Sequence, residues 1–236
     1  MKLVSRLTHA VIAALAFLVS FSALAQAAPE YFREEFLPPA GKGASVLVIS
    51  GQLGPEQRRA FAKDVAALGY YVMLLDGNDT LTRSKPSAQI VRHAITGMLA
   101  SPNNTSKKVA VVGFSMGGGG SLAHVITLSD LVHGAVLYYP ATNWIQNVDG
   151  LAGRIQIPLL FLAAVKDTYK DCCVIDRARE IATAANAKGK SVELVEYAEA
   201  NHGFDLTGSA YRHDYTRDAW KRTEAALKTW HEVGAK

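Results

Sequence analysis

Short apolar runs alternate along this chain with longer stretches of helical periodicity, and this alternation limits the fold more than any other feature. Strand after helix after strand implies a mostly parallel sheet with helices on both faces. Continuous apolar runs such as Ser45 to Ile49 are typical of strands that are buried on both sides. We predict strands over 45–49, 70–75, 109–114, 135–139, 158–165 and 192–197, and helices over 56–68, 86–99, from 115, 175–187 and 215–233.

Composition fits one globular α/β domain. Of 236 residues, 49% are hydrophobic and 19% are charged, which excludes disorder as the main state. No interior linker rich in Pro, Gly or Ser divides the chain, and there is no room for a large lid. The formal charge of +4 comes without a basic run or an aromatic-interleaved basic stripe, so no nucleic-acid partner is expected.

The first 25 residues have the pattern of a cleavable signal peptide. Lys2 and Arg6 precede an apolar core from residue 10 to 24, and Ala23-Leu24-Ala25 offers small residues for cleavage before Gln26. Cleavage after Ala27 and an uncleaved anchor are the alternatives, although the core is short for a membrane span. We expect a secreted or periplasmic protein, residues 26–236, with no stable membrane insertion after cleavage.

Two adjacent cysteines, Cys172 and Cys173, are the only ones in the chain. A bond between neighbours is far from relaxed disulfide geometry, so we expect two small, partly buried thiols rather than a vicinal or intermolecular disulfide. One cysteine pair without a second ligand pair has no zinc spacing, so no metal is expected.

The segment Gly113-Phe114-Ser115-Met116-Gly117 matches G-x-S-x-G between an apolar strand and a helix. In that context the serine occupies a tight turn that exposes its hydroxyl above the sheet. The helix N-terminus places N–H groups near developing negative charge. Three further glycines follow at 118–120. Glycine costs helix stability, so the run predicts either this elbow or a helix packed very closely on the sheet.

A nucleophilic serine needs a base, and in this fold the acid and then the histidine follow it in the chain. Asp167 ends the apolar run 158–165, and His202 lies in a loop after the strand 192–197. Both therefore belong to the same edge of the sheet as Ser115. Asp171 and Asp176 are alternative acids, but they lie further from the strand end.

Backbone N–H groups are expected to stabilise the oxyanion of an acyl-transfer reaction. One is the N–H of Met116, directly after the serine, and the other comes from the loop after an earlier strand, where Gln52 is the candidate. Tyr138, Tyr139, Trp144 and Tyr169 could line an apolar substrate pocket or belong to the core.

These motifs, together with Ala200-Asn201-His202-Gly203-Phe204, resemble the dienelactone hydrolase family of α/β-hydrolases over residues 31–233. The resemblance implies Ser115 as nucleophile, His202 as base and Asp167 as its orienting acid. The chain departs from the best-known members, which have a cysteine at the nucleophile position. They also have a glutamate where Gly51 stands, and an arginine shortly after the histidine where this chain has Asp205 and Leu206.

We therefore expect an exported serine hydrolase that cleaves small esters or lactones through an acyl-enzyme. The sequence implies no metal or organic cofactor. A peptidase or acyltransferase on the same scaffold and a non-catalytic binding module are the alternatives. The complete set of three residues argues against the last. The natural substrate and the oligomeric state stay open.

Overall fold

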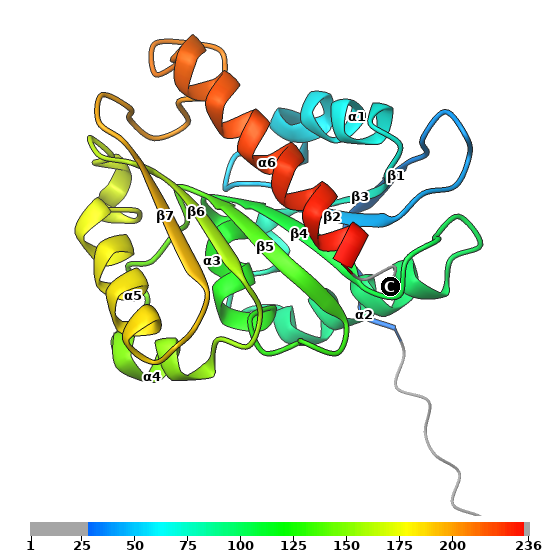
Figure 1. Ribbon diagram of the computed structural model, residues 1–236, viewed down its shortest axis with the longest axis horizontal. Helices are drawn as coiled ribbons and strands as arrows, with labels where there is room; N and C mark the ends of the chain where they lie inside the picture. The colour runs from blue at the N-terminus through cyan, green and yellow to red at the C-terminus, as the bar shows by residue number, and fades with distance from the viewer. Residues whose placement is uncertain (1–27, 234–236) are drawn as a thin grey trace, which may run out of the picture.

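A seven-stranded sheet forms the centre of the molecule in a computed structural model that describes residues 28–233 (Figure 1). The strand order is β1-β3-β2-β4-β5-β6-β7, and only β1 runs antiparallel to its neighbour. The strands are β1 (Arg33–Phe36), β2 (Ser45–Ile49), β3 (Tyr71–Leu75), β4 (Val109–Phe114), β5 (Val132–Tyr138), β6 (Leu159–Ala164) and β7 (Val192–Tyr197). The predicted α/β-hydrolase architecture is thereby confirmed.

Helices cover both faces of this sheet (Figure 1). They are α1 (Arg59–Ala67), α2 (Ser87–Ala100), α3 (Met116–His124), α4 (Val148–Arg154), α5 (Ile175–Ala187) and α6 (His213–Val233). Helices α1 and α6 pack on one face, and α2, α3, α4 and α5 pack on the other. In the described range, no helix is both long and apolar enough to cross a membrane.

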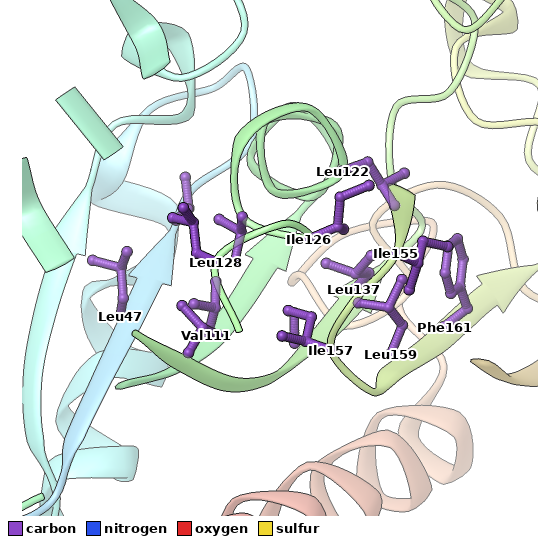
Figure 2. Close-up of a cluster of buried hydrophobic side chains, with 14 of the residues drawn as sticks. Leu47, Val111, Leu122, Ile126, Leu128, Leu137, Ile155, Ile157, Leu159 and Phe161 are labelled. Atoms are coloured by element: carbon purple, nitrogen blue, oxygen red, sulfur yellow. The ribbon is translucent and has the colours of Figure 1, made fainter. Parts of the chain in front are cut away.

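Alternate residues of each central strand enter different cores. In β2, Leu47 and Ile49 face the α2–α5 side, whereas Val46 and Val48 face the α1/α6 side. All four are fully buried, as expected for strands covered on both faces. Figure 2 shows the α2–α5 core, where aliphatic side chains of the strands meet those of α3 and the adjoining loops.

The predicted strands and helices all exist, with ends shifted by a few residues. Helix 56–68 begins as a 3₁₀ turn, η1 (Pro55–Arg58), and α1 ends at Ala67, which leaves Leu68 46% exposed. Two elements were missed. β1 is short, with charged residues at three of its four positions, and α4 contains two glycines, so neither has a strong periodic pattern. The predicted signal peptide lies outside the described residues.

Candidate active site

Ser115 occupies a sharp turn between β4 and α3. Its φ of 49° and ψ of −110° lie outside the regions that non-glycine residues ordinarily adopt. Surrounding hydrogen bonds hold this backbone in place: Ser115 N–H donates to Tyr138 O at 2.9 Å, and Ala141 N–H donates to Ser115 O at 2.8 Å. Strain that neighbours enforce in this way is characteristic of functional sites.

The glycines after Ser115 let α3 approach the strand ends closely. A Cβ on Gly117 would lie 2.5 Å from Ile49 O and Ser50 O, and one on Gly119 would lie 2.6 Å from Ala141 O. Both distances are too short for any side chain. The glycine run is therefore explained by close packing, which keeps the elbow against the ends of the neighbouring strands.

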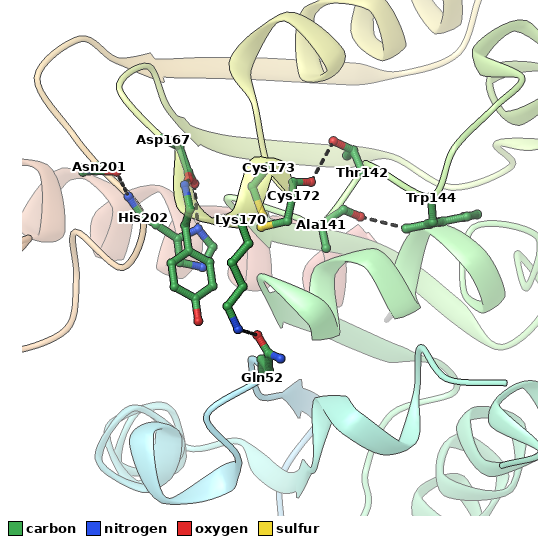
Figure 3. The surroundings of a disulfide bond; sticks show 11 residues. Gln52, Ala141, Thr142, Trp144, Asp167, Lys170, Cys172, Cys173, Asn201 and His202 are labelled. Carbon is green, nitrogen blue, oxygen red and sulfur yellow. Dashed lines mark hydrogen bonds and ion pairs between the residues drawn. A yellow bond between two sulfur atoms is a disulfide. The ribbon is translucent and has the colours of Figure 1, made fainter. Parts of the chain in front are cut away.

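Asp167 and His202 meet at the same edge of the sheet (Figure 3). Asp167 follows β6 with its carboxylate fully buried, and its Oδ2 lies 2.7 Å from His202 Nδ1. The other carboxylate oxygen accepts from Tyr169 N–H at 3.0 Å. The alternative acids lie elsewhere: Asp171 is exposed, and Asp176 pairs with Arg179 on α5. Only Asp167, of these three, is placed to orient the histidine.

Two tyrosine rings fix the imidazole from its sides. Tyr169 stacks on His202 with the ring centroids 4.5 Å apart and the planes 15° apart. The Tyr139 ring lies 4.7 Å away at a tilt of 60°. With Nδ1 held by Asp167, the free nitrogen of the ring is Nε2, the atom that can accept a proton from a hydroxyl.

A cavity of about 300 Å³ contains Ser115 and His202 in its wall. No hydrogen bond joins Ser115 Oγ to the imidazole in the described residues, although such contacts commonly tighten only when substrate binds. Gln52 lines the cavity from the loop after β2. Met116 is the first residue of α3, so no partner inside the helix takes up its N–H. Gln52 thus lines the cavity and Met116 directly follows Ser115, while the role of their N–H groups as oxyanion donors stays a prediction.

The four candidate pocket aromatics separate into two groups. Tyr139 and Tyr169 line the cavity. Tyr138 lies in the α1/α6 core and borders a second hollow, while Trp144 packs against the α2–α5 core and donates from its ring N–H to Ala141 O.

A buried charge cluster beside the cavity had no sequence signal. Arg58 is 4% exposed and donates to Asp205 Oδ2 and to Tyr139 Oη, both at 2.5 Å. Tyr139 in turn donates to Asp205 Oδ1 at 2.5 Å, and the guanidinium lies 3.6 Å from the centre of the Phe114 ring. Arg58 is the last residue of the η1 turn, and its side chain is buried there.

Electrostatics in this cluster favour the charged arginine and the neutral tyrosine. Burial alone would lower the pKa of Arg58, but Tyr139 and Asp205 keep that pKa above its usual value. Burial raises the pKa of the Tyr139 phenol well above its ordinary value. The Tyr139 hydroxyl therefore stays a hydrogen-bond donor to Asp205.

The segment after Asp167 runs beside the site and contacts the loop after β2. In the 3₁₀ turn η3 (Tyr169–Asp171), Lys170 and Asp171 both adopt a φ of 51°, and Lys170 Nζ donates to Gln52 Oε1 at 3.0 Å. Cys172 and Cys173 form a vicinal disulfide directly after this turn, so the expectation of two free thiols was wrong. That expectation rested on the geometry of disulfides between residues apart in the chain, whereas here two neighbouring cysteines are joined.

A strained serine turn, a histidine–carboxylate pair and a shared cavity at the carboxyl edge of a parallel sheet together define an α/β-hydrolase. The sequence profile of the dienelactone hydrolase family matches residues 74–231. The chain belongs to this family of hydrolases.

The chain is also similar to individual proteins in sequence or in fold. A protein of Saccharolobus solfataricus, provisionally named a carboxymethylenebutenolidase, is 26% identical over 202 residues, which are 84% of this chain and 75% of the relative. The solved structure of a Klebsiella pneumoniae protein, provisionally named a dienelactone hydrolase, superposes with a TM-score of 0.72 at 19% identity, covering 83% of this chain and 92% of that one. A thermophilic esterase of Thermogutta terrifontis superposes with a TM-score of 0.60 at 19% identity, covering 88% and 95%.

Proposed function

We propose that this chain is a serine hydrolase that cleaves small carboxylic esters or lactones. The observation that carries the proposal is the joint placement of the Ser115 elbow and of His202, whose Nδ1 contacts the buried Asp167, in the wall of one cavity. The name of the Saccharolobus solfataricus relative and the esterase among the similar structures support an ester or lactone as the substrate class.

The residues suggest a two-step reaction. His202 Nε2 takes the proton of Ser115 as the hydroxyl attacks the carbonyl, and Asp167 stabilises the imidazolium through Nδ1. The backbone N–H groups of Met116 and Gln52 stabilise the oxyanion; loss of one such donor typically costs about 10²–10³ in rate. The imidazolium then protonates the leaving alcohol, and water activated by the same histidine releases the acid.

Substitution of the nucleophile tests this proposal most directly. Ser115→Ala should lower turnover of a short-chain ester by about 10⁶, the size found when a serine hydrolase loses its nucleophile. It should also abolish labelling by a fluorophosphonate probe, while circular dichroism stays that of the wild type. A folded variant with full activity would rule out Ser115. A wild-type protein that neither hydrolyses esters nor takes the label would favour a binding module.

A matched series of Asp→Asn variants tests which carboxylate orients His202. Asp167→Asn should lower turnover by about 10⁴, because the histidine loses the acceptor that orients it. Asp171→Asn and Asp176→Asn should stay near wild type, since neither carboxylate reaches His202. The assignment of the acid fails if one of these two is the impaired variant. Parallel assays with amides and with alcohol acceptors separate an esterase from a peptidase or an acyltransferase.

We also propose that the chain is exported and cleaved near Gln26, on the signal-peptide pattern of residues 1–25. Mass spectrometry of protein made in an exporting host should give a mature chain that starts near that residue. A soluble chain that still starts at Met1 would refute cleavage.

A further inference from the structure

The vicinal disulfide lies directly beside the histidine of the candidate active site (Figure 3). One sulfur atom each from Cys172 and Cys173 and one ring nitrogen of His202 all lie within 4.8 Å of one another. Among residues 28–233, no other three His, Cys, Asp or Glu side chains converge this closely. The spacing of the cysteines alone could not predict this, because the third group comes from a loop after the next strand.

Backbone contacts hold Cys172 in place independently of the sulfur–sulfur bond. Its carbonyl accepts from Thr142 N–H at 2.7 Å and from Asn143 N–H at 3.1 Å, and its own N–H donates to Tyr169 O at 3.0 Å. Cys173 is 6% exposed and lies two residues before α5 begins. Reduction of the disulfide therefore leaves two thiols at the same place, next to the imidazole.

Two thiolates and one imidazole form a ligand set suited to a thiophilic divalent cation. Zinc sites with two cysteines and one histidine leave a fourth position for water. With Zn–S near 2.3 Å and Zn–N near 2.0 Å, tetrahedral ligand atoms lie roughly 3.5–3.8 Å apart. The two sulfur atoms are bonded now and move apart on reduction, whereas the sulfur–nitrogen separations, at most 4.8 Å, have to shorten by no more than about 1 Å. His202 Nδ1 is engaged by Asp167, so Nε2 is the ligand atom, and the carboxylate orients the ring as in many metal sites.

We propose that the reduced protein binds one thiophilic divalent cation, such as Zn²⁺, through Cys172, Cys173 and His202. Reduction by a phosphine consumes one water and gives two thiols and the phosphine oxide. The cation then displaces both thiol protons and binds the neutral imidazole, so that two protons are released per ion. Because Nε2 is occupied, the histidine can no longer accept a proton from Ser115. This last consequence rests on the proposed function, whereas cation binding does not.

Binding is tested without reference to activity. The protein is reduced with a water-soluble phosphine, freed of reductant without oxygen, and titrated with Zn²⁺ by calorimetry and with Co²⁺ by optical absorption. We expect one ion per reduced chain, release of protons from the ligands on binding, and a thiolate-to-cobalt charge-transfer band. The oxidised protein should show none of these. Equal binding by the oxidised and the reduced protein would overturn the proposal.

Variants identify the ligands. Cys172→Ser/Cys173→Ser should abolish the charge-transfer band, and His202→Ala should weaken Zn²⁺ binding at least tenfold. His213→Ala, at an exposed histidine, is the matched control and should bind like wild type. Circular dichroism checks that each variant is folded. If His202→Ala binds as tightly as wild type, the histidine is not a ligand and the proposal fails.

Ester hydrolysis supplies a separate readout. Stoichiometric Zn²⁺ should inhibit the reduced wild type and spare the oxidised protein and the double cysteine variant, and a chelator should reverse the inhibition. If bound Zn²⁺ leaves hydrolysis unaffected, the claim that the ion occupies His202 Nε2 is wrong. Zn²⁺ binding by a protein without any ester hydrolysis would overturn the proposed function and leave the metal site standing.

Discussion

Helices α2 to α5 cover one face of the sheet with a continuous cluster of mostly aliphatic side chains, whereas the core under α1 and α6 contains aromatic rings and buried polar groups. On the α1/α6 side, Arg58 pairs with Asp205, and the Tyr138 hydroxyl meets the Thr223 hydroxyl at 2.8 Å. His231 on α6 has both ring nitrogens buried without a hydrogen-bond partner. The comparison shows that the α2–α5 face depends mainly on the fit of apolar side chains, while the α1/α6 face also depends on matched polar partners and, through His231, on pH.

The largest stability effect is expected at the buried ion pair. Arg58→Met should lower the free energy of unfolding by about 3–5 kcal/mol, because it leaves the Asp205 carboxylate buried and unpaired. Arg59→Met, at a neighbouring residue whose ion pairs are solvent-exposed, should cost far less. Urea unfolding at pH 7 measures both.

A double variant sharpens this result. Arg58→Met/Asp205→Asn removes both charges and keeps an acceptor for the Tyr139 hydroxyl, so its cost should be well below the sum of the two single variants. Additive costs would show that the two side chains do not stabilise each other, and the α1/α6 face would then resemble its counterpart.

On the α2–α5 face, the free energy of unfolding should fall when a buried side chain is shortened. Ile95→Ala, at a fully buried position on α2, should cost about 2–4 kcal/mol through lost burial and the cavity left behind. Leu68→Ala, at an exposed position just after α1, should change stability by less than about 0.5 kcal/mol. Thermal unfolding distinguishes the two, and similar losses at both positions would contradict the burial pattern.

Low pH should destabilise the folded protein through His231 on the α1/α6 face. Burial, and then the neighbouring His133, lower the pKa of His231 to about 4 in the folded state, against about 6.5 in the unfolded chain. The unfolded state therefore binds the proton more readily, and stability that is complete above pH 6.5 falls as the pH drops toward 4. Since the ring is partly exposed, we expect a loss of the order of 1–2 kcal/mol.

His231→Phe should flatten this acid dependence when urea unfolding is compared at pH 7, 5.5 and 4.5. Part of the slope should remain, because burial also lowers the pKa values of His133 and His124. An unchanged slope in the variant would mean that His231 does not sense pH.

The smallest effect is expected at the buried hydroxyl pair. Thr223 donates to Ala219 O at 2.8 Å, so the Tyr138 hydroxyl is the donor to Thr223. Tyr138→Phe removes that donor and leaves only an acceptor unpaired, which should cost about 0.5–1.5 kcal/mol. Chemical denaturation gives the value, and a loss above about 3 kcal/mol would mean that the ring itself has moved.

Sequence patterns predicted the central strands and most of the helices well, because the spacing of apolar residues such as Val, Ile and Leu reflects the period and the burial of these elements. They also predicted where Ser115, Asp167 and His202 lie, since each follows the carboxyl end of a strand. The glycine run was ambiguous from sequence, and the close approach of α3 explains it.

The features that sequence could not predict depend on contacts between distant segments. Arg58 and Asp205 are far apart in the chain, and each alone resembles an ordinary surface charge. The convergence of the cysteines on His202 likewise depends on how two loops meet. The disulfide follows two left-handed residues, Lys170 and Asp171, that composition does not signal.

The charged composition of the two outer strands has a consequence for self-association. β1 exposes Arg33 and Glu35, and β7 exposes Glu193 and Glu196. A strand at a sheet edge has unpaired backbone groups that can template pairing with another chain, and charges on it oppose such pairing. Pairing with another chain through either edge would have to desolvate these charged side chains. The sheet is therefore protected against aggregation at the two places where its hydrogen bonding stays open.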